Sequence, residues 1–255
     1  MTRLSICTTN YNCAHALERH LSSAYKALDG LDFEYIVVDN ESRDGSPGIL
    51  EDWSSTHRNM IVRTRRCTMG RGRQVAFEES SGNYIIVLDT DVVYSDLLRR
   101  FVDTYVARFS DLSMQALYCG IFPRAQWAAA GGRRSLNTNE DVDMWLRVAR
   151  LGTMRWYPLA LGVNLKESDA MGSSDHLSNR YGRGERVVRL VRREWDFLKT
   201  RGSEQVDLDR LIRSNTVDLG LAPEVGPWPQ NRTPQAGFFR AVRLVRDLRV
   251  ALRSS

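Results

Sequence analysis

The stretch YIIVLDTD, residues 84–91, decides the fold. Residues 84–88 form a continuous apolar run, and Asp89 and Asp91 follow directly, on either side of Thr90. An apolar run of this length, bounded by polar residues, is typical of a strand buried on both faces of a parallel sheet. We therefore predict a buried strand that ends in a polar, acidic turn.

Upstream of this strand, short strand-like runs alternate with helical segments. Strands are expected at 3–8, 33–38 and 60–63, and helices at 14–28, 47–56 and 72–80. This alternation predicts an α/β fold with a mainly parallel central sheet flanked by helices. The polar clusters at 8–12, 39–42 and 89–91 each follow a strand, so we expect them to meet at the carboxyl edge of the sheet, where ligands bind.

Asp89 and Asp91 are one residue apart, so both carboxylates can face one cation. Magnesium and manganese are commonly held by one or two carboxylates, with water and substrate phosphates as the other ligands. The alternative is a solvated acidic turn. The sequence holds neither GxGxxG nor GxxxxGK[ST], which argues against a dinucleotide site and a P-loop.

Four motifs, in order along the chain, resemble the nucleotide-sugar glycosyltransferases of family 2, which have the GT-A fold. They are LSICTTNYN (4–12), YIVVDNESRDGS (35–46), GRGRQVAFEESSGNYIIVLDTD (70–91) and GGRRSLNTNEDVDMWLRVARLG (131–152). The resemblance implies a metal-dependent, inverting transferase that uses a nucleotide-activated sugar, a UDP or GDP sugar being the expected donor, with Mn²⁺ or Mg²⁺ as cofactor. The acceptor is open between a glycan and a lipid-linked carrier.

The resemblance also implies roles for individual residues. Asp141 would be the catalytic base, with Glu140 beside it, and Asp91 the main metal ligand, with Asp89 between metal and ribose. Nucleotide contacts are expected from Thr8, Thr9, Tyr11, Asp39, Asp89 and one or both of Arg71 and Arg73, which are alternatives for the same place near the diphosphate.

Two features leave room for other interpretations. Gln74 and Ala76 stand where the family commonly has Asn and Gly, which weakly favours a non-catalytic GT-A-like module that binds nucleotide sugars or partners. Glu140 and Asp141 also fit the acidic first turn of a helix capped by Asn139, an arrangement that is compatible with catalysis.

In the second half, strands are expected at 117–122 and within 154–163. Trp127 would either stack on a sugar or pack in the core. His176 is a candidate extra metal ligand, with a structural histidine as the alternative. We expect a transferase domain at 1–180 and a helical, basic extension at 181–255.

The extension is basic, because residues 180–255 hold 16 basic and 9 acidic residues, although Arg-rich coding bias would give the same excess. Arginines recur every three or four positions in GFFRAVRLVRDLRVALR (237–253), opposite apolar residues. Such a helix can bind an anionic membrane surface, its own domain or a second subunit, so a homodimer stays open.

The composition limits the remaining classes. With 255 residues, 42% hydrophobic and 26% charged, the chain is neither collagen-like, coiled-coil nor wholly disordered. Four cysteines without CxxC spacing favour a reduced, cytoplasmic protein. If the basic helix binds a membrane, the protein would be peripheral on its inner face. No cleaved signal peptide is expected at the N-terminus. Nucleic acid is not an expected partner, because lysine is scarce and the first part of the chain is acidic.

Overall fold

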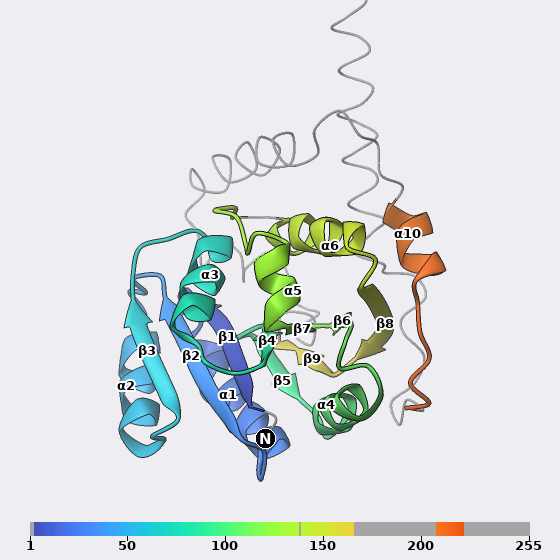
Figure 1. The fold of residues 1–255 in the computed structure, drawn as a ribbon. Helices are drawn as coiled ribbons and strands as arrows, with labels where there is room; N and C mark the ends of the chain where they lie inside the picture. Colours follow the sequence, from blue (N-terminus) through green and yellow to red (C-terminus); the bar gives the residue numbers. More distant parts are fainter. Residues whose placement is uncertain (1–2, 138, 166–207, 222–255) are drawn as a thin grey trace, which may run out of the picture. The chain divides into compact units, whose positions relative to one another are not determined.

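A mixed seven-stranded sheet, with helices on both faces, forms the centre of the fold (Figure 1). The computed structural model describes residues 3–137, 139–165 and 208–221. The strand order is β3-β2-β1-β4-β7-β6-β8, and a separate two-stranded sheet pairs β5 with β9. The expected α/β fold, with a mainly parallel central sheet flanked by helices, is confirmed.

The first half of the chain alternates strictly between strand and helix, as the sequence predicted. The elements are β1 (Leu4–Asn10), α1 (Ala14–Leu28), β2 (Phe33–Asp39), α2 (Ser46–Thr56), β3 (Met60–Thr64), α3 (Met69–Glu79) and β4 (Tyr84–Leu88). Strands β1 to β4 pair in parallel. Helix α3 begins three residues before its predicted start because Thr68 caps it, its side chain accepting a hydrogen bond from the Arg71 N–H (3.1 Å).

The second half departs from the prediction at residues 113–123. In place of one strand at 117–122, two antiparallel strands, β6 (Ser113–Leu117) and β7 (Cys119–Pro123), turn at Tyr118, which has a φ of 63°. β7 also runs antiparallel to β4. The other elements are β5 (Val92–Tyr94), α4 (Leu97–Arg108), α5 (Arg124–Ala129), α6 (Glu140–Arg150), β8 (Met154–Ala160), β9 (Gly162–Asn164) and α10 (Leu208–Ser214).

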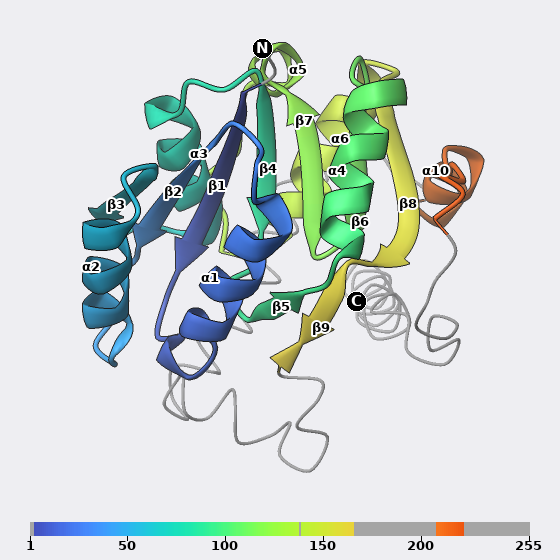
Figure 2. The same cartoon turned by 90° about the horizontal axis from the view of Figure 1, so that it is seen from below.

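Helices cover both faces of the sheet (Figures 1 and 2), and a large hydrophobic core lies on each face. Successive residues of a strand point to opposite faces. Along β2, Tyr35 and Val37 therefore pack with α1, α2 and α4, whereas Ile36 and Val38 pack with α3, α5 and α6. Burial on both faces explains why these strands are continuous apolar runs.

From β1 the chain adds β2 and β3 on one side of the sheet and then crosses to place β4 on the other side of β1. The boundary between β1 and β4 is therefore the topological switch point. Ligands bind at such a switch point, outside the carboxyl ends of the strands. The Thr8 hydroxyl joins the two strands there by donating to the Leu88 carbonyl (2.6 Å). The site described below lies at this edge.

Residues 208–221 lie against β8. The backbone of Trp156 accepts a hydrogen bond from Val217 N–H (2.9 Å) and donates one to the Asn215 carbonyl (3.1 Å), and the Tyr157 hydroxyl donates to the Leu221 carbonyl (2.9 Å). This segment, which we assigned to the extension, thus belongs to the compact unit that ends at Leu221. The expected boundary at 180, the helix at 237–253 and His176 lie outside the described residues.

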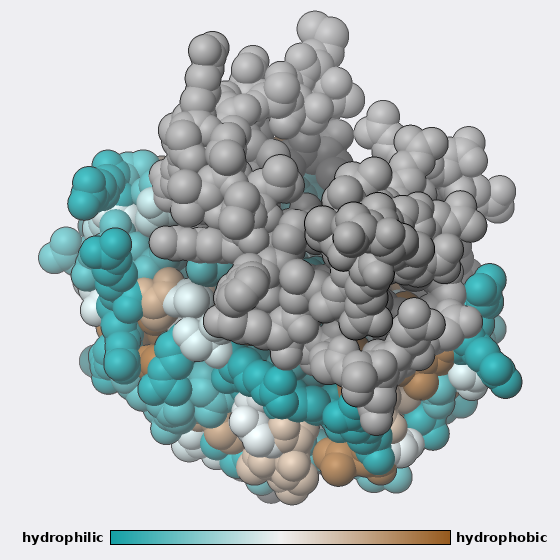
Figure 3. Space-filling view, turned by 90° about the horizontal axis from the view of Figure 1, so that it is seen from above, coloured by the Kyte–Doolittle hydropathy of each residue, from teal (hydrophilic) through white to brown (hydrophobic). Residues whose placement is uncertain are grey.

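Viewed from above, the described surface is mostly hydrophilic, with scattered apolar patches (Figure 3). Among the described residues, the large apolar side chains that are exposed are Met69, Leu151 and Val163. In the same part of the chain, none of the helices has the length and apolar character needed to cross a membrane.

Candidate active site

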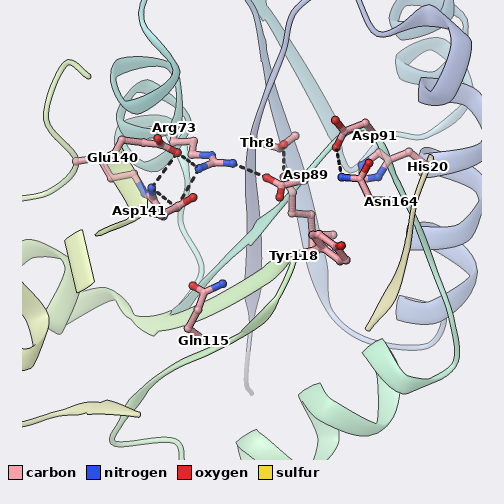
Figure 4. A network of polar contacts seen from close by, with 12 residues as sticks. Thr8, His20, Arg73, Asp89, Asp91, Gln115, Tyr118, Glu140, Asp141 and Asn164 are labelled. Atoms are coloured by element: carbon pink, nitrogen blue, oxygen red, sulfur yellow. Dashed lines mark hydrogen bonds and ion pairs between the residues drawn. The ribbon is translucent and has the colours of Figure 1, made fainter. Parts of the chain in front are cut away.

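Arg73 lies at the centre of the site and joins the end of β4 to the start of α6 (Figure 4). Its Nη2 is 2.6 Å from Asp89 Oδ1, and its Nη1 is 3.0 Å from Asp141 Oδ1 and also contacts Glu140 Oε1. The Arg73 side chain is only 4% exposed. One buried guanidinium therefore holds three of the carboxylates that the sequence predicted for the site.

Close packing of α3 against β1 places Arg73 there. A Cβ on Gly72 would lie 2.3 Å from Thr9 Cγ2, so a side chain at position 72 would push the helix away from the strand. Arg71, the alternative in the prediction, points elsewhere: its guanidinium pairs with Glu78 (2.8 Å) and is 36% exposed. The structure therefore places Arg73, and not Arg71, in the site.

A second buried arginine, Arg133, clamps Asp141 from the loop before α6. Its Nη1 is 2.5 Å from Asp141 Oδ1, its side chain is inaccessible to solvent, and its guanidinium lies 5.3 Å from the centre of the Trp127 ring. Sequence reasoning gave Arg133 no role. Arg133 lies in the sequence motif that precedes Glu140, but Arg134 lies in the same motif, so the sequence does not distinguish the two arginines.

Gln74 anchors the loop that carries Arg133. Its Oε1 accepts hydrogen bonds from the Arg133 backbone N–H (2.8 Å) and from Trp127 Nε1 (3.0 Å). The Gln that replaces the family's usual Asn thus has a clear structural task. Trp127 is fully buried, which settles its two alternatives in favour of the core.

The environments of the two adjacent carboxyl groups push their pKa values apart. Burial, followed by the charge of Asp141, raises the pKa of Glu140 to about 7, against the attraction of Arg73 and Arg133. Burial would also raise the pKa of Asp141, but Arg133 and Arg73 outweigh it and hold that pKa far below its ordinary value. The Asp141 side chain is 37% exposed and that of Glu140 only 4%. Asp141 is therefore the ionised and more exposed carboxylate of the two.

The first turn of α6 is acidic as expected, but Asn139 does not cap it through its side chain. Asn139 has a left-handed φ of 57° and makes no side-chain capping hydrogen bond. The turn is instead held by arginines: Asp143 pairs with Arg147 (2.6 Å), whose guanidinium also reaches the carbonyls of the loop before the helix. Arg147 thus braces the loop.

The two aspartates of the acidic turn point to different partners. Asp89 reaches Arg73, while Asp91, which is 5% exposed, accepts a hydrogen bond from Asn164 Nδ2 (3.4 Å; Figure 4). The described residues contain no group of three or more His, Cys, Asp or Glu side chains placed to bind a metal. The residues present nonetheless fit a hard divalent cation. Asp89 and Asp91 offer carboxylate oxygens one residue apart at the end of β4, and oxygen is the donor that Mg²⁺ and Mn²⁺ prefer.

At the carboxyl end of β2, Asp39 is almost fully buried. Its carboxylate accepts hydrogen bonds from Asn10 Nδ2 (2.7 Å), the Ser42 hydroxyl (2.6 Å) and the Ser42 N–H (2.8 Å). The Asn10 side-chain oxygen is buried without a hydrogen-bond partner, so it is an acceptor ready for an N–H of a ligand. The sequence placed Asn10 and Ser42 in the polar clusters expected at this edge but gave neither an individual role, although Asn10 pairs with Asp39 across β1 and β2.

The other predicted nucleotide residues divide by exposure. Thr8 is buried and bonded to Leu88, and Thr9 is partly buried against α3, so both shape the sheet edge. Tyr11 follows β1 directly and is partly exposed at that edge.

A parallel sheet edge that carries an acidic turn, a buried arginine and an acidic helix start defines the catalytic domain of the GT-A class. A family model described as glycosyl transferase family 2 matches residues 5–158. The chain belongs to this family.

The individual relatives have low sequence identity to this chain. The dolichol-phosphate mannosyltransferase of Pyrococcus furiosus is 25% identical over 118 residues, which is 46% of this chain and 33% of that protein. Among solved structures, a mannosyltransferase from Pyrobaculum calidifontis in complex with GDP-Man and Mn²⁺ is 19% identical (TM-score 0.53), with 64% of this chain and 56% of that chain covered. Staphylococcus aureus TarS 1-349 in complex with UDP-GlcNAc is 16% identical (TM-score 0.52; 64% and 57% covered). The chain thus spans about a third or less of the length of the curated relatives it matches.

Proposed function

We propose that the chain transfers a sugar from a nucleotide-diphosphate donor to an acceptor hydroxyl, by a single displacement that inverts the anomeric centre, with the help of Mn²⁺ or Mg²⁺. The observation that carries the proposal is the Arg73 cluster, which joins the acidic turn after β4 to the exposed carboxylate of Asp141. It brings a place for the donor diphosphate and a proton acceptor to one edge of the sheet.

Asp141 is the proposed general base. It takes the proton of the acceptor hydroxyl while the acceptor oxygen bonds to the anomeric carbon, and the bond from that carbon to the diphosphate oxygen breaks. The nucleoside diphosphate leaves with the electron pair. Arg73 and Arg133 keep Asp141 ionised and fix its direction, whereas buried Glu140 positions both arginines.

The opposite end of the site binds the donor. Asn10, Asp39 and Tyr11 lie where the nucleoside would bind, and Asp89 and Asp91 would hold the divalent metal. When bound, the metal offsets negative charge that develops on the leaving diphosphate. The similar proteins that bind GDP-Man and UDP-GlcNAc make GDP and UDP sugars the first donors to test.

The deciding experiment is calorimetric titration of the whole chain with UDP, GDP, CMP and dTDP, each with Mn²⁺ and again with a chelator. We expect one nucleotide to bind tightly and chelation to abolish that binding. Binding of none of the four would contradict the proposal and favour the non-catalytic module.

Turnover is tested separately with the sugar form of the nucleotide that binds. The release of nucleoside diphosphate should fall at least a hundredfold in Asp141→Asn, in line with loss of a general base. The matched control is Asp143→Asn, an acidic residue of the same helix turn that pairs with Arg147. A smaller loss in Asp141→Asn than in the control would remove Asp141 from the role of base.

The acceptor and the cellular location are further proposals, with a lipid-linked carrier or a glycan as acceptor. The basic segment 237–253 would bring the domain to an anionic membrane surface from the cytoplasm. Sedimentation with anionic vesicles, with and without residues 236–255, tests this. Equal sedimentation of both forms would remove the membrane proposal.

A further inference from the structure

The residue that faces Asp91 comes from β9, which sequence reasoning did not connect with the acidic turn. β9 pairs antiparallel with β5, and its last residue, Asn164, is the partner of Val92 in the register. The next residue, Leu165, donates its backbone N–H to the Asp91 carbonyl (2.9 Å). Backbone pairing on both sides therefore fixes Asn164 beside the acidic turn.

The Asn164 side chain points at the carboxylate that the proposed metal would need. Its Nδ2 is 3.4 Å from Asp91 Oδ1, and Figure 4 shows the two side chains facing each other. The neighbouring Val163 side chain is 56% exposed, as expected for the opposite face of the strand. The strand thus directs an amide, and no apolar group, toward Asp91.

An amide in this place has two uses. Through its NH₂ group it donates to the carboxylate, as it does here; after a half turn about the Cβ–Cγ bond its oxygen occupies the same place. Amide oxygens, like carboxylates, are ligands for hard divalent cations. We propose that Asn164 supplies a neutral oxygen ligand to the divalent cation that Asp91 holds, an inference that rests on the metal-assisted function proposed above.

The charges of the site favour a neutral ligand. Asp91 is buried, and a third carboxylate close to Asp89 and Asp91 would add repulsion in the metal-free protein. An amide adds an oxygen without adding charge. Asn164 would also keep its position when the metal leaves, because it then donates to Asp91.

The test measures Mn²⁺ binding directly, by the loss of the free Mn²⁺ signal in electron paramagnetic resonance, for the whole chain with and without GDP or UDP. We expect Asn164→Ala to weaken Mn²⁺ binding about tenfold. Asn164→Asp, which keeps an oxygen but loses the NH₂ donor, should bind within about threefold of the parent or more tightly, since ligand charge strengthens binding. Val163→Ala, on the outer face of the same strand, is the matched control and should bind as the parent does.

The outcomes separate the two proposals. If the parent binds Mn²⁺, Asp91→Ala does not and Asn164→Ala binds normally, the inference is wrong and the metal site stands. If Asn164→Asp loses as much affinity as Asn164→Ala, the amide acts only as a donor to Asp91, and the ligand role is overturned. If the parent binds no Mn²⁺ with either nucleotide, both proposals fail. Thermal unfolding of each variant establishes that it is folded.

Discussion

Gly132 is a position at which a single added methyl group should disturb the loop that carries Arg133. Its φ is +67°, and a Cβ there would lie 2.4 Å from Gln74 Oε1. The left-handed conformation alone costs a non-glycine residue about 1–2 kcal/mol. Displacing Gln74 would also break its hydrogen bonds to Trp127 Nε1 and the Arg133 N–H, and each buried donor left unpaired costs about 1–3 kcal/mol. We therefore expect Gly132→Ala to lower the free energy of unfolding by about 3–8 kcal/mol.

Gly131 provides the matched control. Its φ is +78°, but a Cβ there would have no neighbour closer than Arg147 Nη1 at 3.9 Å. Gly131→Ala should therefore lose only the backbone contribution of about 1–2 kcal/mol. In urea unfolding followed by tryptophan fluorescence, with a slope near 2 kcal/mol per molar, the two variants should differ in midpoint by about 1 M or more.

A double mutant tests the cause. If the overlap with Gln74 is the reason, Gly132→Ala combined with Gln74→Ala should cost at least about 1 kcal/mol less than the sum of the single changes. Equal destabilisation by Gly131→Ala and Gly132→Ala, or strict additivity of Gly132→Ala and Gln74→Ala, would refute the reasoning.

Three other changes follow from the described contacts. Burial raises the pKa of Glu140 to about 7 in the folded chain, so its carboxyl binds a proton more tightly there than in the unfolded chain. This group therefore makes the free energy of unfolding fall as the pH rises from about 4.5 to 7. Glu140→Gln should abolish that part of the pH dependence, measured by urea unfolding. Arg73→Ala should lower the free energy of unfolding by about 3–5 kcal/mol, because it removes a buried guanidinium that pairs with the buried carboxylate of Glu140 and with Asp89 and Asp141, whereas Arg71→Ala at an exposed pair should cost less than about 1 kcal/mol. Cys67 alone among the four cysteines is not buried, so a thiol reagent should modify one thiol in the native protein and four after denaturation; two thiols reacting equally fast would contradict this.

The sequence was a good guide to the first half of the chain. The strands there are buried on both faces, so their apolar runs mark them directly, as in β2 and β4. It was a poor guide to residues 113–123, because Tyr118 turns the chain with a positive φ that no glycine, asparagine or aspartate announces. The apolar pattern continues through that turn, so it was interpreted as one strand.

Within the site, the sequence predicted which carboxylates meet, but not which arginines hold them. Arg71 and Arg73 are two positions apart on a helix, and only the packing of α3 against β1 decides which of them faces inward. Arg133 and Asn164 could not be found by motif, because their roles depend on a loop anchored by Gln74 and on the pairing of β5 with β9. The predicted roles of His176 and of the basic helix at 237–253 stay predictions.

The guanidinium that joins β4 to α6 couples the proposed donor and acceptor ends of the site thermodynamically. Arg73 touches Asp89 on one side and Asp141 on the other, so the electrostatic free energy of each carboxylate depends on the other. By linkage, any ligand that changes the charge at Asp89 must change the proton affinity of Asp141, and protonation of Asp141 must change the affinity for that ligand by the same factor. The shared guanidinium is therefore an electrostatic link by which occupancy at Asp89 affects Asp141.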